Sequence, residues 1–119
     1  MALRVSEIVI DCAGHGAVVD FWAAALGYER HAVNEQYVAL VPPDPPEPGR
    51  PALLFQKVPE GKVAKNRVHL DLRGDVMADE VARLVALGAT SVVERSLGDL
   101  RWTVMTDPEG NEFCVAGSR

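Results

Sequence analysis

The sequence predicts an α+β fold built from two copies of one unit, in which a strand and a helix are followed by further strands. The first observation is that segments 8–27 and 68–88 both read as strand, short turn, amphipathic helix and Leu-Gly stop. The second is that the two Leu-Gly pairs, at Leu26-Gly27 and Leu87-Gly88, lie 61 positions apart, about half the chain. The third is that period-2 alternation follows each helix. Repetition at this distance indicates a duplicated unit.

Both helices are predicted from apolar residues that recur at i, i+3, i+4, i+7 and i+8, the spacing of one helix face. The glycine just past each helix is expected to adopt the left-handed conformation that satisfies the last helical carbonyls. The stripe of the first helix is Val18, Phe21, Trp22, Ala25 and Leu26, and that of the second is Met77, Val81, Leu84, Val85 and Gly88.

Alternating segments predict strands near 36–41, 52–58, 91–94, 100–106 and 112–116. The loop from Pro42 to Pro51 holds six of the eight prolines, so we place it at a sheet edge or over a cavity, as a lid or as a surface excursion. No composition break separates the halves beyond 59–66. We therefore expect one domain, 1–119, with modules of about 1–60 and 61–119.

Composition limits the class of partner. A formal charge of -5, an isoelectric point near 5.1 and the lack of a basic run argue against nucleic-acid binding. No apolar run approaches the roughly 20 residues that cross a bilayer, and no signal peptide is recognisable. We expect a cytoplasmic protein with a small-molecule partner. Cys12 and Cys114 fall on opposite faces of their strands, so we expect free thiols.

Strand alternation also separates the residues that pack on the helices from those that do not. The helix-facing set is Ile8, Ile10, Cys12, Val68, Leu70, Leu72, Phe113 and Val115. The opposite face carries Glu7, Val9, Asp11, Arg67, His69, Asp71, Glu112, Cys114 and Ala116. Burying these ionisable groups without partners would cost several kcal/mol, on the order of the usual desolvation penalty. We therefore place the ligand site on this second face.

Several motifs together resemble one known family. They are the helix end LGY at 26–28, NRVHLDL at 66–72, ALGA at 86–89 and DPEGNEFC at 107–114. The chain resembles the vicinal oxygen chelate superfamily, which contains glyoxalases, bleomycin-resistance proteins and dioxygenases, and within it the glyoxalase-like branch. The resemblance implies two tandem β-α-β-β-β modules forming a cupped, mostly antiparallel sheet, commonly in a homodimer. DPEGN itself is explained as turn chemistry, with Gly110-Asn111 supplying positive-φ residues.

The resemblance also implies four metal-ligand positions, at Glu7, near Leu53 or Leu54, at His69 and at Cys114. An aliphatic residue and a cysteine interrupt this set, and Gln56 is a weak substitute, so we expect no full metal site. Glu7, His69 and Cys114 remain an alternative three-ligand site for a divalent ion such as Zn, Ni, Mn or Fe. A two-residue slip would put Glu112 in place of Cys114.

Two classes of function follow. The first is a metal-independent protein that binds a small molecule through Tyr37, Gln56, Arg67, Trp102 and Cys114, with aromatic stacking on Tyr37 and Trp102. The second is an enzyme: a metal-dependent lyase, isomerase or dioxygenase, or a metal-free catalyst in which Asp71 orients His69 as a base. Cys114 acts as a nucleophile only if its pKa is lowered, and Lys65, Asn66 and Arg67 are candidates for binding a ligand carboxylate or phosphate.

Overall fold

A computed structural model describes residues 2–44 and 49–118 of the chain. The chain forms two compact units, Met1–Gly61 (unit 1) and Lys62–Arg119 (unit 2). Part of the proline-rich loop, 45–48, lies outside the described residues, so its expected role as a lid or surface excursion stays a prediction. Neither helix in the described part of the chain has the length and apolar character that crossing a membrane requires.

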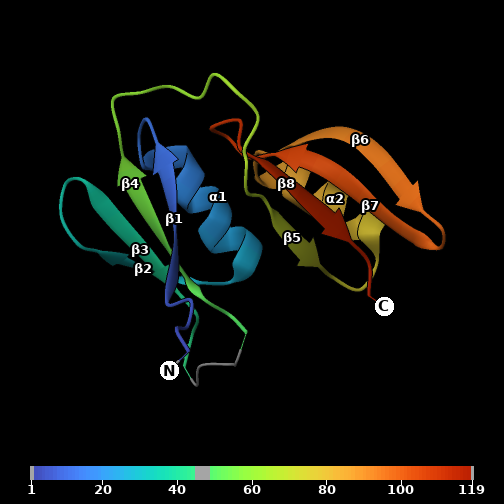
Figure 1. Cartoon of the computed structure of the whole chain (residues 1–119), viewed down its shortest axis with the longest axis horizontal. Coiled ribbons are helices and arrows are strands. Elements are labelled where there is room, and N and C mark those ends of the chain that lie inside the picture. Colours follow the sequence, from blue (N-terminus) through green and yellow to red (C-terminus); the bar gives the residue numbers. More distant parts are fainter. Residues whose placement is uncertain (1, 45–48, 119) are drawn as a thin grey trace. The chain divides into compact units, whose positions relative to one another are not determined.

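Unit 1 is a four-stranded mixed sheet with one helix (Figure 1). The strand order is β1-β4-β3-β2; β1 and β4 are parallel, and the other two pairings are antiparallel. The elements are β1 (Glu7–Cys12), α1 (Gly16–Leu26), β2 (Glu29–Ala32), β3 (Tyr37–Val41) and β4 (Ala52–Lys57).

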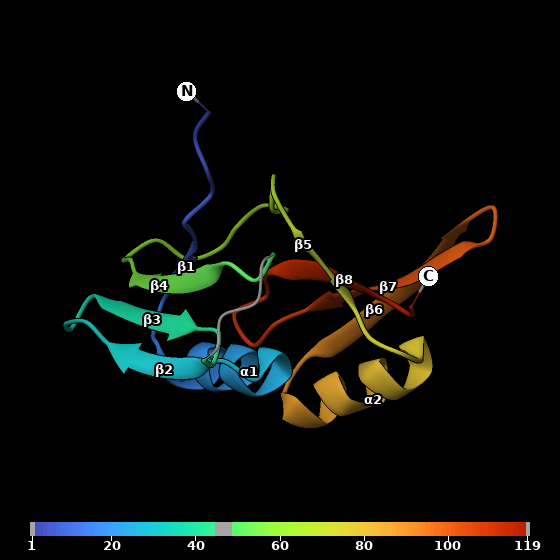
Figure 2. The same ribbon diagram turned by 90° about the horizontal axis from the view of Figure 1, so that it is seen from below.

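Unit 2 repeats this topology with the order β5-β8-β7-β6, in which β5 and β8 are the parallel pair. The predicted duplication and the mostly antiparallel α+β architecture are confirmed. Figure 2 shows each helix lying against one face of the sheet of its own unit. The elements are β5 (Leu70–Arg73), α2 (Met77–Leu87), β6 (Thr90–Leu97), β7 (Leu100–Thr106) and β8 (Glu112–Ala116).

The core of unit 1 lies between α1 and its sheet. The predicted stripe residues Val18, Phe21 and Trp22 are buried, and the two aromatic rings meet edge-on with centroids 5.2 Å apart. Alternate residues of the inner strands, including Leu53 and Phe55, are buried as well. Burial of large apolar side chains is the main stabilising term for such a layer.

Both helices end at the expected glycine. Gly27 has φ 67° and its N–H donates to the carbonyl of Ala23, while Gly88 has φ 121° and donates to Leu84 and Val85. A residue with a Cβ would be strained at either backbone conformation. The predicted role of these glycines is therefore confirmed.

The sequence reading was wrong at several places, among them Val85 of the predicted second helix stripe, which is 47% exposed. It omitted β2, whose four residues are all exposed and show no alternation. It placed Val68 in a strand against the helix, but β5 begins at Leu70 and Val68 is 77% exposed. It also expected positive φ at Asn111, but among the described residues only glycines have positive φ.

The contrast between Leu84 and Val85 gives a stability prediction, because they are neighbours on α2 with 2% and 47% exposure. We expect Leu84→Ala to lower the free energy of unfolding by about 2–5 kcal/mol through the cavity it leaves. Val85→Ala, the matched control, should change it by less than about 1 kcal/mol. Urea unfolding followed by circular dichroism measures both, and equal losses would contradict the assignment of the core.

Candidate functional site

Unit 2 has a hollow on one face of its sheet. The cavity has a volume of about 480 Å³ and every residue that lines it belongs to unit 2. We call this side the open face of unit 2 and define it by the lining residues of the strands and the segment before β5. They are Lys65, His69, Asp71, Leu72, Arg73, Arg95, Leu97, Leu100, Arg101, Trp102, Val104, Glu112, Cys114, Val115 and Ala116.

Strand register explains how this face is assembled. Cross-strand partners point to the same side of a sheet, so each row of paired positions is a row of neighbouring side chains. One row runs from Asp71 through Cys114 to Val104. The next runs from Arg73 through Ala116 and Trp102 to Arg95. The alternate residues of β8, Phe113 and Val115, are 1% exposed, as predicted for the core side, although Val115 also borders the cavity.

His69, Asp71 and Cys114 form a cluster at one end of the cavity. Their nitrogen, oxygen and sulfur atoms all lie within 4.8 Å of one another. His69 Nε2 is 3.1 Å from Asp71 Oδ1. The Cys114 thiol donates a hydrogen bond to the Asp71 carboxylate. The carboxylate therefore joins the imidazole to the thiol, and this is the arrangement that the oriented-base hypothesis requires.

The thiol of Cys114 is not activated. Burial is the largest cause that raises its pKa, and the charge of Asp71 and their hydrogen bond raise the pKa further, while the charge of Lys65 lowers it. A nucleophilic cysteine needs a lowered pKa. The hypothesis that Cys114 is a nucleophile is therefore not supported by its surroundings. Cys12 and Cys114 are both buried and are not joined in a disulfide, as the expectation of two thiols requires.

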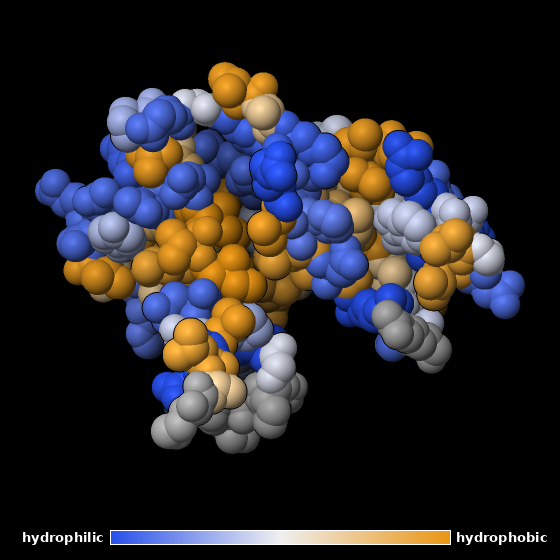
Figure 3. Space-filling view, viewed as in Figure 1, coloured by the Kyte–Doolittle hydropathy of each residue, from blue (hydrophilic) through white to orange (hydrophobic). Residues whose placement is uncertain are grey.

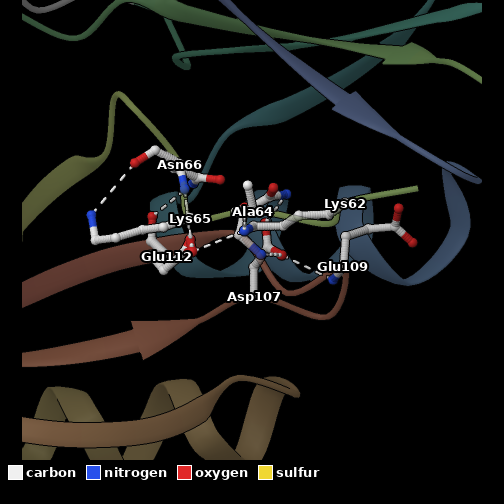
Figure 4. Close-up of polar contacts among 8 residues, drawn as sticks. Lys62, Ala64, Lys65, Asn66, Asp107, Glu109 and Glu112 are labelled. Carbon is white, nitrogen blue, oxygen red and sulfur yellow. Dashed lines mark hydrogen bonds and ion pairs between the residues drawn. The ribbon is translucent and has the colours of Figure 1, made fainter. Parts of the chain in front are cut away.

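Glu112 holds the segment before β5 against β8 (Figure 4). Lys62 donates to its carboxylate at 2.9 Å, and the backbone N–H of Asn66 donates at 3.2 Å. The Asn66 side chain donates to the Glu112 carbonyl at 3.3 Å. Burial by itself raises the pKa of Glu112, but the bonds from Lys62 and Asn66 outweigh it and leave the pKa below its ordinary value. Asn66 is thus engaged in the fold and is not a free ligand contact.

The DPEGN motif is turn chemistry, as predicted (Figure 4). Asp107 is 4% exposed and accepts hydrogen bonds from the N–H groups of Glu109 and Asn111 and from the Asn111 side chain. Gly110, with φ 86°, donates to the Asp107 carbonyl. The turn sets the start of β8 and hence the register of Cys114.

The remaining predicted site residues lie apart from this cavity lining. Tyr37 and Gln56 are cross-strand partners in unit 1. Leu54, not Leu53, shares the face of Glu7, because Leu53 is buried at 2%. Arg67 is exposed in the segment before β5 and does not line the cavity.

The open side of the unit 1 sheet carries an apolar row and a polar one. Val9, Leu54 and Ala39 form the first, and Asp11, Gln56 and Tyr37 form the second. Figure 3 shows apolar side chains gathered over β1 and β4. Glu7 belongs to this unit, so its combination with His69 and Cys114 stays a prediction.

Three arginines of the cavity, Arg73, Arg95 and Arg101, were missed by the sequence reading. Arg73 continues the alternation of His69 and Asp71, so the signal was present in β5. Arg95 was missed because the predicted strand ended at 94, whereas β6 continues to Leu97.

Comparison with known proteins identifies the family. A family model described as Glyoxalase-like domain matches residues 7–116. The comparison with curated proteins gives no match. Among solved structures, a glyoxalase/bleomycin resistance protein/dioxygenase family enzyme from Burkholderia phytofirmans PsJN superposes with a TM-score of 0.76 at 16% identity, covering 97% of this chain and 98% of that one.

Two further solved structures share the fold. A mutant of the fosfomycin resistance protein FosX from Listeria monocytogenes, complexed with Mn(II) and 1S,2S-dihydroxypropylphosphonic acid, has a TM-score of 0.78 at 14% identity over 99% of this chain and 93% of that one. The bleomycin-binding protein of Streptomyces verticillus, complexed with copper(II)-bleomycin, has a TM-score of 0.66 at 15% identity. The match covers 100% of this chain and 99% of that one.

The lowered pKa of Glu112 predicts a pH-dependent contribution to stability. Its folded-state value lies below the unfolded-state value of about 4.3. The stabilisation is therefore present above about pH 4.3 and is lost as the pH falls through the folded-state pKa. We expect Glu112→Gln to lower the free energy of unfolding at pH 7, and the gap from the parent protein to close as the pH falls toward about 3. Urea unfolding across this range measures it, with the exposed Glu60→Gln as control; a gap independent of pH would contradict the prediction.

Proposed function

We propose that this chain, which belongs to the glyoxalase-like domain family, binds a small molecule in the cavity on the open face of unit 2. The observation that carries the proposal is the cavity itself. Its volume of about 480 Å³ lies within the roughly 300–1,000 Å³ range of ligand pockets. Of its fifteen lining residues, seven are apolar and eight are ionisable, so the cavity offers both apolar contact area and polar groups that can orient a ligand.

The proposed contacts divide by chemistry. Trp102, half-buried and beside the small Ala116, offers an indole surface for stacking, and Val104 adds an apolar wall. The linked cluster of His69 and Asp71 supplies polar contacts at one end, with Cys114 beside them. Relatives of the same fold are named for binding small molecules, bleomycin in one case and a phosphonic acid in another. Tyr37, Gln56 and Arg67 remain proposed contacts outside this lining.

A second candidate is a metal-dependent enzyme, and the His69, Asp71 and Cys114 cluster favours it. Imidazole, carboxylate and thiolate together are a suitable donor set for zinc, with a fourth position open. Ligand atoms around a tetrahedral zinc lie roughly 3.5 Å apart, so atoms separated by up to 4.8 Å would need only small side-chain movements. This donor set differs from the one expected from the family resemblance, because it contains Asp71 and not Glu7.

The same cluster is also satisfied without an ion. Asp71 bonds both His69 and Cys114, so each group already has a partner. Binding a metal would require the loss of the thiol proton, against the surroundings that raise the pKa of Cys114. These contacts favour the metal-free binding function over the metal-dependent one.

We further propose that the protein acts as a cytoplasmic homodimer, as is common in this family. The exposed apolar residues Val76 and Val85 of the α2 region are consistent with a covered surface.

The binding function predicts that filling the cavity abolishes ligand binding. A thermal-shift screen of a metabolite library should yield compounds that raise the unfolding temperature of the parent protein by mass action. Ala116→Trp, which places an indole in the cavity, should remove this shift. Ala82→Trp, at an exposed position of α2, is the matched control and should keep it. Hits that stabilise Ala116→Trp as well as the parent bind elsewhere and count against the proposal.

The two candidates differ in metal content. We expect protein purified without chelator, then incubated with Zn, Ni, Mn or Fe(II) and desalted, to retain well under about one ion per chain, because the donor set is internally satisfied. Elemental analysis by mass spectrometry measures this. One equivalent of metal that disappears in His69→Ala and persists in His31→Ala would establish the second candidate instead.

A further inference from the structure

We propose that the ligand of this cavity is a planar organic anion, whose charged group binds Arg73 and Arg95 and whose apolar body stacks on Trp102. This inference rests on the proposed binding function and adds the chemical class of the ligand. It is carried by the charge balance of the cavity and by the order of residues along one cross-strand row.

The row crosses all four strands of unit 2. Arg73 on β5 pairs with Ala116 on β8, Ala116 with Trp102 on β7, and Trp102 with Arg95 on β6. All four residues line the cavity. With strands about 4.8 Å apart, the row spans roughly 14 Å between its two arginines. The long side chains at both ends can therefore reach over an aromatic group placed between them.

The two acidic residues of the cavity lining have other neighbours. Asp71 lies 3.1 Å from His69, which offsets its charge only when the imidazole is protonated, and the Glu112 carboxylate binds Lys62, which is outside the lining. One cation is neutralised too, since Arg101 Nε donates to Glu94 at 2.8 Å. Neither carboxylate is thus engaged with Arg73 or Arg95.

The other cations of the lining have no acidic partner in the described part of the chain. Within residues 2–44 and 49–118, no ion pair joins a carboxylate to Arg73, Arg95 or Lys65. Arg73 Nη1 donates to the Gly117 carbonyl at 3.1 Å, which orients the guanidinium and leaves its other donors available. The cavity thus carries unbalanced positive charge although the chain carries -5.

These two features select one class of ligand. A guanidinium binds carboxylate, sulfonate or phosphonate groups by paired, charge-assisted hydrogen bonds. The small Ala116 leaves room beside the indole of Trp102, and Leu97 and Leu100 extend the apolar wall. An inorganic anion would leave these walls uncovered, and a neutral apolar compound would gain nothing from the arginines. A planar apolar molecule that bears one anionic group would contact both the arginines and the apolar walls.

A matched pair of fluorescent probes tests the inference. 8-Anilinonaphthalene-1-sulfonate and N-phenyl-1-naphthylamine share one aromatic skeleton and differ by the sulfonate. We expect the parent protein to bind the sulfonate more tightly, with an advantage that shrinks at high salt because exposed charges are screened. Arg73→Gln and Arg95→Gln should each weaken sulfonate binding roughly tenfold, the usual size of a lost hydrogen bond to a charged group. These substitutions should leave the affinity for the neutral probe within about twofold of the parent value, since this probe makes no such bond.

The controls separate charge from folding. Arg83→Gln removes one positive charge on α2, outside the lining, and should change neither affinity. Trp102→Ala should weaken both probes, and Trp102→Phe should retain part of the binding. Circular dichroism and the unfolding midpoint of every variant exclude loosened folds, which bind such dyes nonspecifically.

The outcomes distinguish the two proposals. If both probes bind equally, both respond to Trp102→Ala, and neither responds to the arginine variants, the anionic class is wrong and the binding function stands. If Trp102→Ala and Ala116→Trp alter neither probe, the proposed site itself is wrong. Selective loss of the sulfonate in both arginine variants establishes the anionic class.

Discussion

The parallel pairing of β5 with β8 is the constraint on which the site of unit 2 depends. β8 lies between β5 and β7, so its alternate side chains meet partners on both sides. The pairing sets Asp71 beside Cys114 and Arg73 beside Ala116. A slip of one residue would turn every side chain of β8 to the other face. It would put Phe113 into the cavity and Cys114 into the core, so the buried Phe113 and Val115 also fix the positions of the polar groups.

The turn before β8 supports this register. Asp107 gathers three hydrogen bonds from Glu109 and Asn111, and Glu112 joins the first position of β8 to Lys62 and Asn66. These hydrogen bonds fix the position of the first residues of β8, and the burial of one face of β8 in the core fixes the rest. The family motif around DPEGN therefore contributes to the site indirectly, by positioning Cys114, and none of its residues from Asp107 to Asn111 lines the cavity.

Local pattern was sufficient to predict most elements. β7 and β8 have the predicted bounds because their alternation is strong and one face is buried. β2 gave no such signal, since all four of its residues are exposed at a sheet edge. Val68 was misplaced because periodicity continues past the point at which β5 leaves its partner. Strand partners are a long-range property, so alternation could place His69, Asp71 and Cys114 on one face, and only the family resemblance combined His69 with Cys114 in one site.

The duplicated topology does not carry duplicated chemistry. Both units have their parallel pair at one edge of the sheet, but the open side of unit 1 presents Asp11, Gln56 and Tyr37 in one row and Val9, Leu54 and Ala39 in the next. In unit 2 the corresponding surface presents Asp71 and Cys114, with arginines in the next row.

Net charge follows the same division, because eight of the twelve Lys and Arg residues fall within 62–119. The acidic composition argues against a polyanionic macromolecule as partner, since that would need an extended basic surface. It places no such limit on a small anion, because the field inside a cavity is set by its nearest charges. Global composition and local lining therefore describe different partners, and the lining decides which ligand the cavity accepts.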